Sequence, residues 1–203
     1  MSAPARPESC WSCHGPLPSG SLFCPVCGAV QGPDQSDYFH RLGLEPGYDL
    51  VTDALERSYF DLQRKLHPDR FATRSPREKA MSQAQATALN DAYQTLKDPL
   101  RRAMYLLALR QGKADGIPVL PPAPPDVLME QMERREELAA ARSAGAVREV
   151  LQAAQADMLA CRKELSAAFA AGDCGQAALL SLRLKYLSKL AEDCRLRRLP
   201  VTA

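Results

Sequence analysis

The sequence predicts a mostly α-helical protein in three parts: a small cysteine-rich N-terminal module, a helical domain built on an antiparallel hairpin, and a C-terminal three-helix bundle. Three observations support this prediction. Two Cys-x-x-Cys pairs lie near the N-terminus, apolar residues recur at helical spacing from residue 36 onward, and a proline-rich stretch separates two helical regions. The expected parts are residues 1–34, 36–111 and 126–203, with a linker at 112–125.

The N-terminal module is defined by four cysteines, Cys10, Cys13, Cys24 and Cys27. Two thiolates spaced two residues apart can grip one ion from a tight turn, and two such turns complete a tetrahedral sulfur site that suits structural zinc. A segment this short cannot fold on apolar burial alone, so the metal is expected to stabilise it. Iron in place of zinc, His14 as a substitute ligand, and free or disulfide-bonded cysteines are the alternatives.

Two long helices are expected on either side of the tripeptide His67-Pro68-Asp69. Pro68 ends the first helix, and Ser75-Pro76-Arg77-Glu78 starts the second with a capping box. The apolar face of the first helix consists of Leu55, Tyr59, Leu62 and Leu66, whereas Arg57, Arg64 and Lys65 lie off that face. The inner face of the second helix consists of Ala86, Leu89, Ala92, Tyr93 and Leu96.

This hairpin resembles the J domain, the module by which co-chaperones engage ATPases of the heat-shock protein 70 (DnaK-type) family. The facing helix carries Asn-Asp-Ala-Tyr-Gln-Thr-Leu at residues 90–96, followed by Asp98-Pro99, which strengthens the resemblance. The resemblance implies that the chain stimulates ATP hydrolysis by the partner and is not itself an enzyme. The residues implied to bind the chaperone are His67, Pro68, Asp69, Arg57, Arg64 and Lys65.

A further helix is expected from Pro99 to Arg110, and the linker that follows it contains five prolines. Beyond Asp126 three helices are expected, with a break at Gly145 and a turn at Gly172. Cys161 and Cys194 fall on the apolar seams and are expected to be buried, whereas the role of Cys174 is undecided. The seams comprise Val147, Leu151, Ala154, Met158, Cys161, Leu165 and Ala168, and then Leu180, Leu184, Leu187, Ala191 and Cys194.

The J-like region, the proline linker and the run from Val127 to Leu138 together resemble the HscB family of iron–sulfur cluster co-chaperones, over residues 36–199. The four-cysteine module resembles that of animal members. Membership implies a cluster scaffold protein of the IscU type as the second partner. The residues implied to bind it are Leu128, Met129, Met132, Glu133, Glu136, Lys185 and Tyr186. From periodicity alone, Leu128, Met129 and Met132 fit the bundle core equally well.

The composition argues against two further classes of partner, nucleic acids and membranes. Lys and Arg number 26 against 24 acidic residues, and this near balance argues against a general nucleic-acid binder. No apolar run approaches the roughly 20 residues that span a bilayer, so no membrane partner is expected. Family resemblance points to the mitochondrial matrix, but Met1 to Ser9 make a poor transit peptide, which leaves the cytoplasm open. Two alternative functions are a carrier that holds metal or a cluster on the N-terminal thiolates, and a direct adaptor for cluster-receiving proteins.

Overall fold

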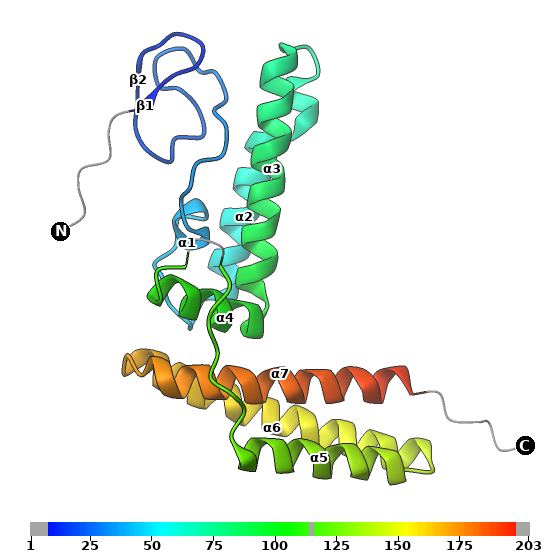
Figure 1. The fold of residues 1–203 in the computed structure, drawn as a ribbon. Coiled ribbons are helices and arrows are strands. Elements are labelled where there is room, and N and C mark those ends of the chain that lie inside the picture. The colour runs from blue at the N-terminus through cyan, green and yellow to red at the C-terminus, as the bar shows by residue number, and fades with distance from the viewer. Residues whose placement is uncertain (1–7, 114–115, 198–203) are drawn as a thin grey trace, which may run out of the picture. The chain divides into compact units, whose positions relative to one another are not determined.

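The computed structural model describes residues 8–113 and 116–197, which are mostly helical, so the predicted fold class is confirmed (Figure 1). The chain divides into two compact units. The first comprises Met1–Pro46 and Leu50–Asp98, and the second comprises Gly47–Asp49 and Pro99–Ala203. Within the described ranges, no helix combines the length and the apolar character needed to cross a membrane.

The cysteine-rich module of the first unit has little regular structure. Strand β1 (Glu8–Ser9) pairs antiparallel with β2 (Pro16–Leu17), and an isolated bridge joins Phe23 to Val30. The sequence did not predict these strands, because two residues are too few to show an alternating pattern. Buried Cys10, Cys24 and Leu17 form the small core of the module together with Ala29.

The hairpin of the first unit consists of α2 (Thr52–Leu66) and α3 (Pro76–Lys97), with the short α1 (Tyr38–Arg41) beside α3. The predicted capping box is present, since Ser75 and Glu78 each accept a hydrogen bond from the backbone of the other. Tyr59 and Tyr93 stack across the two helices with their ring centroids 4.0 Å apart. The predicted apolar faces meet in a core that includes Leu55, Leu66, Leu89, Ala92 and Leu96.

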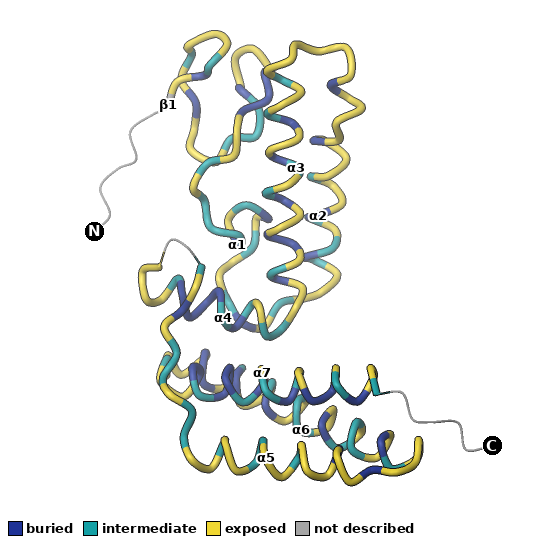
Figure 2. Tube along the Cα trace, turned by 45° about the vertical axis from the view of Figure 1, so that its right-hand side comes forward, coloured by how far each residue is buried: buried dark blue, intermediate teal, exposed yellow. Residues whose placement is uncertain are grey.

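The second unit contains α4 (Pro99–Arg110), α5 (Pro125–Ala140), α6 (Ala144–Ala170) and α7 (Cys174–Leu196). Helices α6 and α7 pack along their length, and Cys161 and Cys194 are buried between them, as predicted. Figure 2 shows buried positions recurring along these helices, and the first half of α7 is buried on most of its sides. Helix α4 packs on α7 inside this unit, whereas the predicted domain boundary lies at residue 111.

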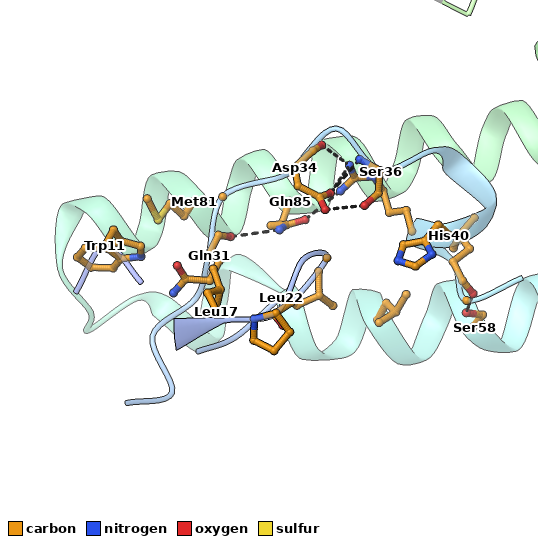
Figure 3. Close-up of a pocket in the computed structure, with 18 of the residues that line it drawn as sticks. Trp11, Leu17, Leu22, Gln31, Asp34, Ser36, His40, Ser58, Met81 and Gln85 are labelled. Carbon is orange, nitrogen blue, oxygen red and sulfur yellow. Dashed lines mark hydrogen bonds and ion pairs between the residues drawn. The ribbon is translucent and has the colours of Figure 1, made fainter. Parts of the chain in front are cut away.

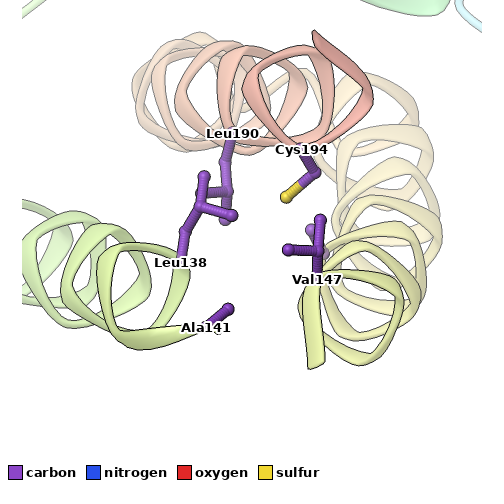
Figure 4. Close-up of a cluster of buried hydrophobic side chains, with 6 residues drawn as sticks. Leu138, Ala141, Val147, Leu190 and Cys194 are labelled. Atoms are coloured by element: carbon purple, nitrogen blue, oxygen red, sulfur yellow. The ribbon is translucent and has the colours of Figure 1, made fainter. Parts of the chain in front are cut away.

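Two details of the bundle bear on its first helix. The expected break at Gly145 is wrong: α5 ends at Ala140 and Gly145 lies in the first turn of α6. The reason is a cap, because the Ser143 hydroxyl accepts a hydrogen bond from the N–H of Ala146 and begins α6 there. A cluster of apolar side chains then joins the end of α5 to the other helices (Figure 4): Leu138, Ala141, Val147, Ala154, Leu190 and Cys194.

Candidate functional site

The four sulfur atoms of the N-terminal module lie close together. The Sγ atoms of Cys10, Cys13, Cys24 and Cys27 all fall within 4.8 Å of one another. The Cys10–Cys27 and Cys13–Cys24 Sγ distances are both 3.7 Å, far longer than a disulfide bond of about 2.05 Å. An ion with four sulfur bonds of about 2.3 Å gives a tetrahedron with edges of roughly 3.8 Å. The arrangement therefore fits a tetrahedral metal ion.

Two equivalent backbone turns hold these cysteines. The N–H of His14 donates to the carbonyl of Cys10, and the N–H of Gly28 donates to the carbonyl of Cys24, both at 2.9 Å. His14 and Gly28 occupy the same place in their turns, and both have left-handed backbone conformations, with φ of 58° and 72°. The four cysteines form a complete set of ligands without His14. His14 therefore contributes its left-handed backbone conformation to the turn, and its imidazole is not needed as a ligand.

Backbone N–H groups lie close to the sulfur atoms of Cys10 and Cys24. The N–H of Ser12 lies 3.3 Å from Cys10 Sγ, and the N–H of Val26 lies 3.4 Å from Cys24 Sγ. Burial raises the pKa of Cys10, but hydrogen bonds from the backbones of Cys13 and Ser12 outweigh this effect and lower the pKa to about 6. A thiolate, which is the form that binds metal, is therefore favoured at Cys10. At Cys13 the Gly15 backbone hydrogen bond lowers the pKa, but the neighbouring thiols and burial outweigh it and raise the pKa to about 12.

The loop that carries His67-Pro68-Asp69, called the HPD loop below, connects the two long helices and exposes its acidic residue. His67 ends α2, and Pro68 opens a 3₁₀ turn, Pro68–Phe71. The Ser82 hydroxyl of α3 donates to the carbonyl of Leu66 at 2.7 Å, which fixes the end of α2 just before the loop. The Asp69 side chain is 90% exposed, and its carboxylate lies 3.6 Å from His67 Nδ1. The carboxylate is thus open to a partner.

The solvent-facing side of α2 carries the three predicted basic residues, the acidic residues Asp53 and Asp61, and an aromatic residue. Arg57, Arg64 and Lys65 are all exposed. Phe60 is 51% exposed and lines the same shallow depression as Arg64 and His67. Sequence reasoning missed Phe60, because a single aromatic residue off the apolar period carries no signal by itself.

The first half of α5 presents apolar side chains to solvent. Leu128, Met129 and Met132 are 41%, 60% and 62% exposed, so the alternative that places them in the bundle core is wrong. Among the side chains of α5, Leu138 is the buried one. The acidic residues Glu133 and Glu136 are exposed on the same helix.

The predicted basic and aromatic pair lies on α7. Lys185 is exposed and Tyr186 is half-buried. Tyr186 lines a narrow groove between α5 and α7 together with Val127 and Gln131. The structure thus brings Tyr186 next to α5, whereas Leu128, Met129 and Met132 lie outside the lining of the groove.

Comparisons with known proteins place both helical regions in families. Residues 37–105 match the DnaJ domain, and residues 123–195 match the HSCB C-terminal oligomerisation domain. The chain is 36% identical over 202 residues to the human iron–sulfur cluster co-chaperone protein HscB. The alignment covers 95% of this chain and 83% of the human one. The chain belongs to the HscB family. The predicted resemblance is confirmed.

Further relatives of this HscB-family chain agree in sequence and in fold. The HscB homologue of Aeromonas salmonicida is 39% identical over 165 residues, covering 77% of this chain and 93% of its own. The crystal structure of human HscB superposes with a TM-score of 0.86 at 35% identity, covering 96% of this chain and 100% of the human one. The DnaJ-domain match includes the HPD loop, and the C-terminal match includes α5 and most of α7. The roles of individual residues stay predictions.

Sequence reasoning missed two polar links in this HscB-family protein, one buried and one partly buried. Gln31 and Gln85 meet between the cysteine module and α3, and Glu130 and Arg183 meet between α5 and α7. Both links join residues more than 50 positions apart in the chain. Polar residues at such separations follow no periodic pattern, so no signal in one sequence pairs them.

Proposed function

We propose that this protein is a co-chaperone of iron–sulfur cluster assembly. In this proposal it binds a cluster scaffold protein of the IscU type, delivers it to a heat-shock protein 70 family ATPase and stimulates ATP hydrolysis by that partner. The observation that carries the proposal is the exposed Asp69 carboxylate on a short loop between two packed helices. The human and mouse relatives, both named iron–sulfur cluster co-chaperones, support it.

The proposed ATPase contact is electrostatic. The exposed Arg57, Arg64 and Lys65 attract an acidic surface of the partner and raise the rate of encounter. The loop then presents Asp69, with His67 and Pro68 beside it, for a charge-assisted hydrogen bond with a basic group of the partner. This chain contributes binding and orientation, while the hydrolysis takes place on the ATPase.

The proposed scaffold contact lies on α5 with α7 at its edge. Flexible methionines beside a leucine form an adaptable apolar surface, which suits the recognition of a folded client. Charged residues at its rim set the orientation of the complex. The residues proposed to bind the scaffold are Leu128, Met129, Met132, Glu133, Glu136, Lys185 and Tyr186.

The proposed metal is structural zinc, held by Cys10, Cys13, Cys24 and Cys27. Four thiolates fill a tetrahedral ion and leave no position for a substrate, and the metal supplies folding energy to the small module. Metal analysis tests this identity. One zinc ion per chain in a colourless protein supports the proposal, whereas brown protein with visible absorption supports the alternative of a cluster carrier.

The proposed location is the mitochondrial matrix, by family resemblance. The segment Met1 to Ser9 lies mostly outside the described residues. Fractionation of cells that express the full-length protein with a C-terminal tag tests the location. Recovery in the cytosol alone would refute it.

The decisive experiment measures steady-state ATP hydrolysis by the matching heat-shock ATPase with scaffold protein present. The wild-type chain should stimulate hydrolysis, and Asp69→Asn should abolish the stimulation while leaving the melting temperature unchanged, because the side chain is 90% exposed. Glu45→Gln, at another exposed acid of the same unit, serves as the matched control. Equal stimulation by wild type and Asp69→Asn would overturn the proposal.

A further inference from the structure

We propose that helix α3 supports the metal site from outside the cysteine module, through a buried chain of hydrogen bonds from Gln85 to Gln31 to the Cys10 sulfur. In this arrangement metal retention and docking of the module on α3 depend on each other. The inference rests on the proposal that the four thiolates hold a metal ion. It does not depend on the proposed co-chaperone activity.

The inner link is Gln31, whose side chain is in contact with a proposed metal ligand. Gln31 is only 4% exposed, and its Nε2 lies 3.4 Å from Cys10 Sγ and 2.7 Å from the carbonyl of Ala29. An N–H donor of this kind stabilises the thiolate and fixes its orientation. Groups that orient a metal ligand in this way contribute to metal affinity although they do not touch the ion.

The outer link is Gln85 of α3, which is 3% exposed. Its Nε2 donates to the backbone carbonyl of Gln31 at 3.2 Å, as Figure 3 shows, and its Oε1 accepts from Arg41 Nη1 at 3.3 Å. Arg41 in turn pairs with Asp34 at 3.3 Å. Each end of the Gln85 amide is thereby satisfied, and the backbone of Gln31 is held against the helix.

A second contact joins the module to the start of α3. The Arg77 guanidinium lies over the Trp11 ring, 4.5 Å from its centroid. Trp11 sits between Cys10 and Cys13, and its indole N–H donates to the carbonyl of Val30 at 2.8 Å. A residue inside the first metal-binding turn is therefore held by a cation–π contact from α3.

These polar contacts matter because apolar packing between the module and the helices is incomplete. A cavity of about 410 Å³ lies between them. Figure 3 shows Leu17 and Leu22 of the module on one side of it and Met81 and Gln85 of α3 on the other, with Ser58 of α2 at the end near His40. The hydrogen bonds through Gln85 and the Arg77–Trp11 contact join the module to α3 beside this open pocket.

Metal binding and docking of the cysteine module on α3 are thermodynamically linked, so each affects the other equally. If docking on α3 raises the metal affinity by some factor, bound metal must strengthen docking by the same factor. Loss of the metal removes the order of the first turn, and with it the positions of Gln31 and Trp11 that α3 recognises. The structure thus assigns Gln31, Gln85 and Arg77 as positioning residues of the metal site.

The first test measures metal loss from the full-length protein to a chromogenic chelator. Gln31→Ala should weaken metal affinity about 10–100-fold, the range typical for groups that orient a ligand. Gln85→Met, a change of similar volume outside the module, should speed metal release by a smaller factor. The matched control is Gln83→Met on the exposed side of the same helix. Equal release from Gln85→Met and Gln83→Met would overturn the inference.

Gln31→Ala and Gln85→Met alter buried residues and could impair folding, so a variant at an exposed position is needed as well. Arg77→Ala removes only the contact with Trp11, at an exposed position, and should also speed metal release. Hydrogen exchange supplies the reciprocal readout: chelation of the wild type should reduce protection in the first turns of α3, and Arg77→Ala should already show part of that loss. Unchanged α3 protection after chelation would refute the coupling. A wild-type protein purified without metal would instead refute the proposed metal site.

Discussion

The Arg183 guanidinium in α7 and the Glu130 carboxylate in α5 form a bidentate ion pair. Nε lies 2.8 Å from Oε2, and Nη2 lies 2.7 Å from Oε1. The two side chains are 27% and 29% exposed. The buried apolar contact of α5 lies near its other end, at Leu138. The pair therefore anchors the half of α5 whose methionines face solvent, which leaves those apolar side chains free for a partner.

Arg183→Met should lower the free energy of unfolding by about 1–2 kcal/mol. The substitution leaves a partly buried carboxylate without its donor, and partial exposure makes the loss smaller than for a fully buried pair. Urea unfolding followed by circular dichroism measures it. The control is Lys189→Met, which breaks exposed ion pairs with Glu192 and Asp193 and should change stability by no more than about 0.5 kcal/mol. Equal effects of the two variants would contradict this account of α5.

The same ion pair predicts an acid-dependent loss of stability. The Arg183 hydrogen bond outweighs the effect of burial and holds the pKa of Glu130 below its ordinary value of 4.5. Because the folded-state pKa is depressed, the stabilisation is fully present above the unfolded pKa and is lost as the pH falls through the folded one. The difference in unfolding free energy between wild type and Arg183→Met should therefore shrink as the pH is lowered below 4.5. A difference that stays constant into strong acid would show that Glu130 is not responsible.

The helices of this protein were predictable because their causes are local. Alternating steps of three and four residues placed Leu165, Leu184 and Leu187 on the buried seams, and the structure confirms each. The capping box at Ser75 and the proline after His67 likewise set helix ends from adjacent residues. The two Cys-x-x-Cys pairs predicted a common site because only two short turns must meet.

The remaining features depend on contacts that local patterns do not encode. The α5 face shows this: periodicity placed Met132 in the core and on the surface with equal weight, and only family resemblance favoured exposure. The buried Gln85 side chain donates to the backbone carbonyl of Gln31, 54 positions away, so in the sequence it looks like an ordinary surface residue. The break before Ser143 was misplaced because a serine cap outweighed the nearby Gly145.

Met132→Ala should separate binding from stability. Its side chain is 62% exposed, so truncation should cost less than about 0.5 kcal/mol of stability while weakening scaffold binding about tenfold or more. Leu138→Ala in the same helix provides the contrast, because this side chain is 8% exposed and its loss should cost about 2–5 kcal/mol. Calorimetric titration with scaffold protein and thermal unfolding measure the two effects. Unchanged binding by Met132→Ala would remove this residue from the proposed interface.

The two metal-binding turns predict opposite outcomes for substitutions at equivalent positions. Gly28 has φ of 72° and no neighbour within 4 Å of an added Cβ, so Gly28→Ala meets backbone strain alone. This strain is about 1–2 kcal/mol, partly offset by reduced freedom of the unfolded chain, and should speed metal release. His14→Gly relieves the same strain at φ of 58° and should retain one metal ion per chain with release no faster than wild type. Chelator competition measures both, and metal loss from His14→Gly would make the imidazole a ligand after all.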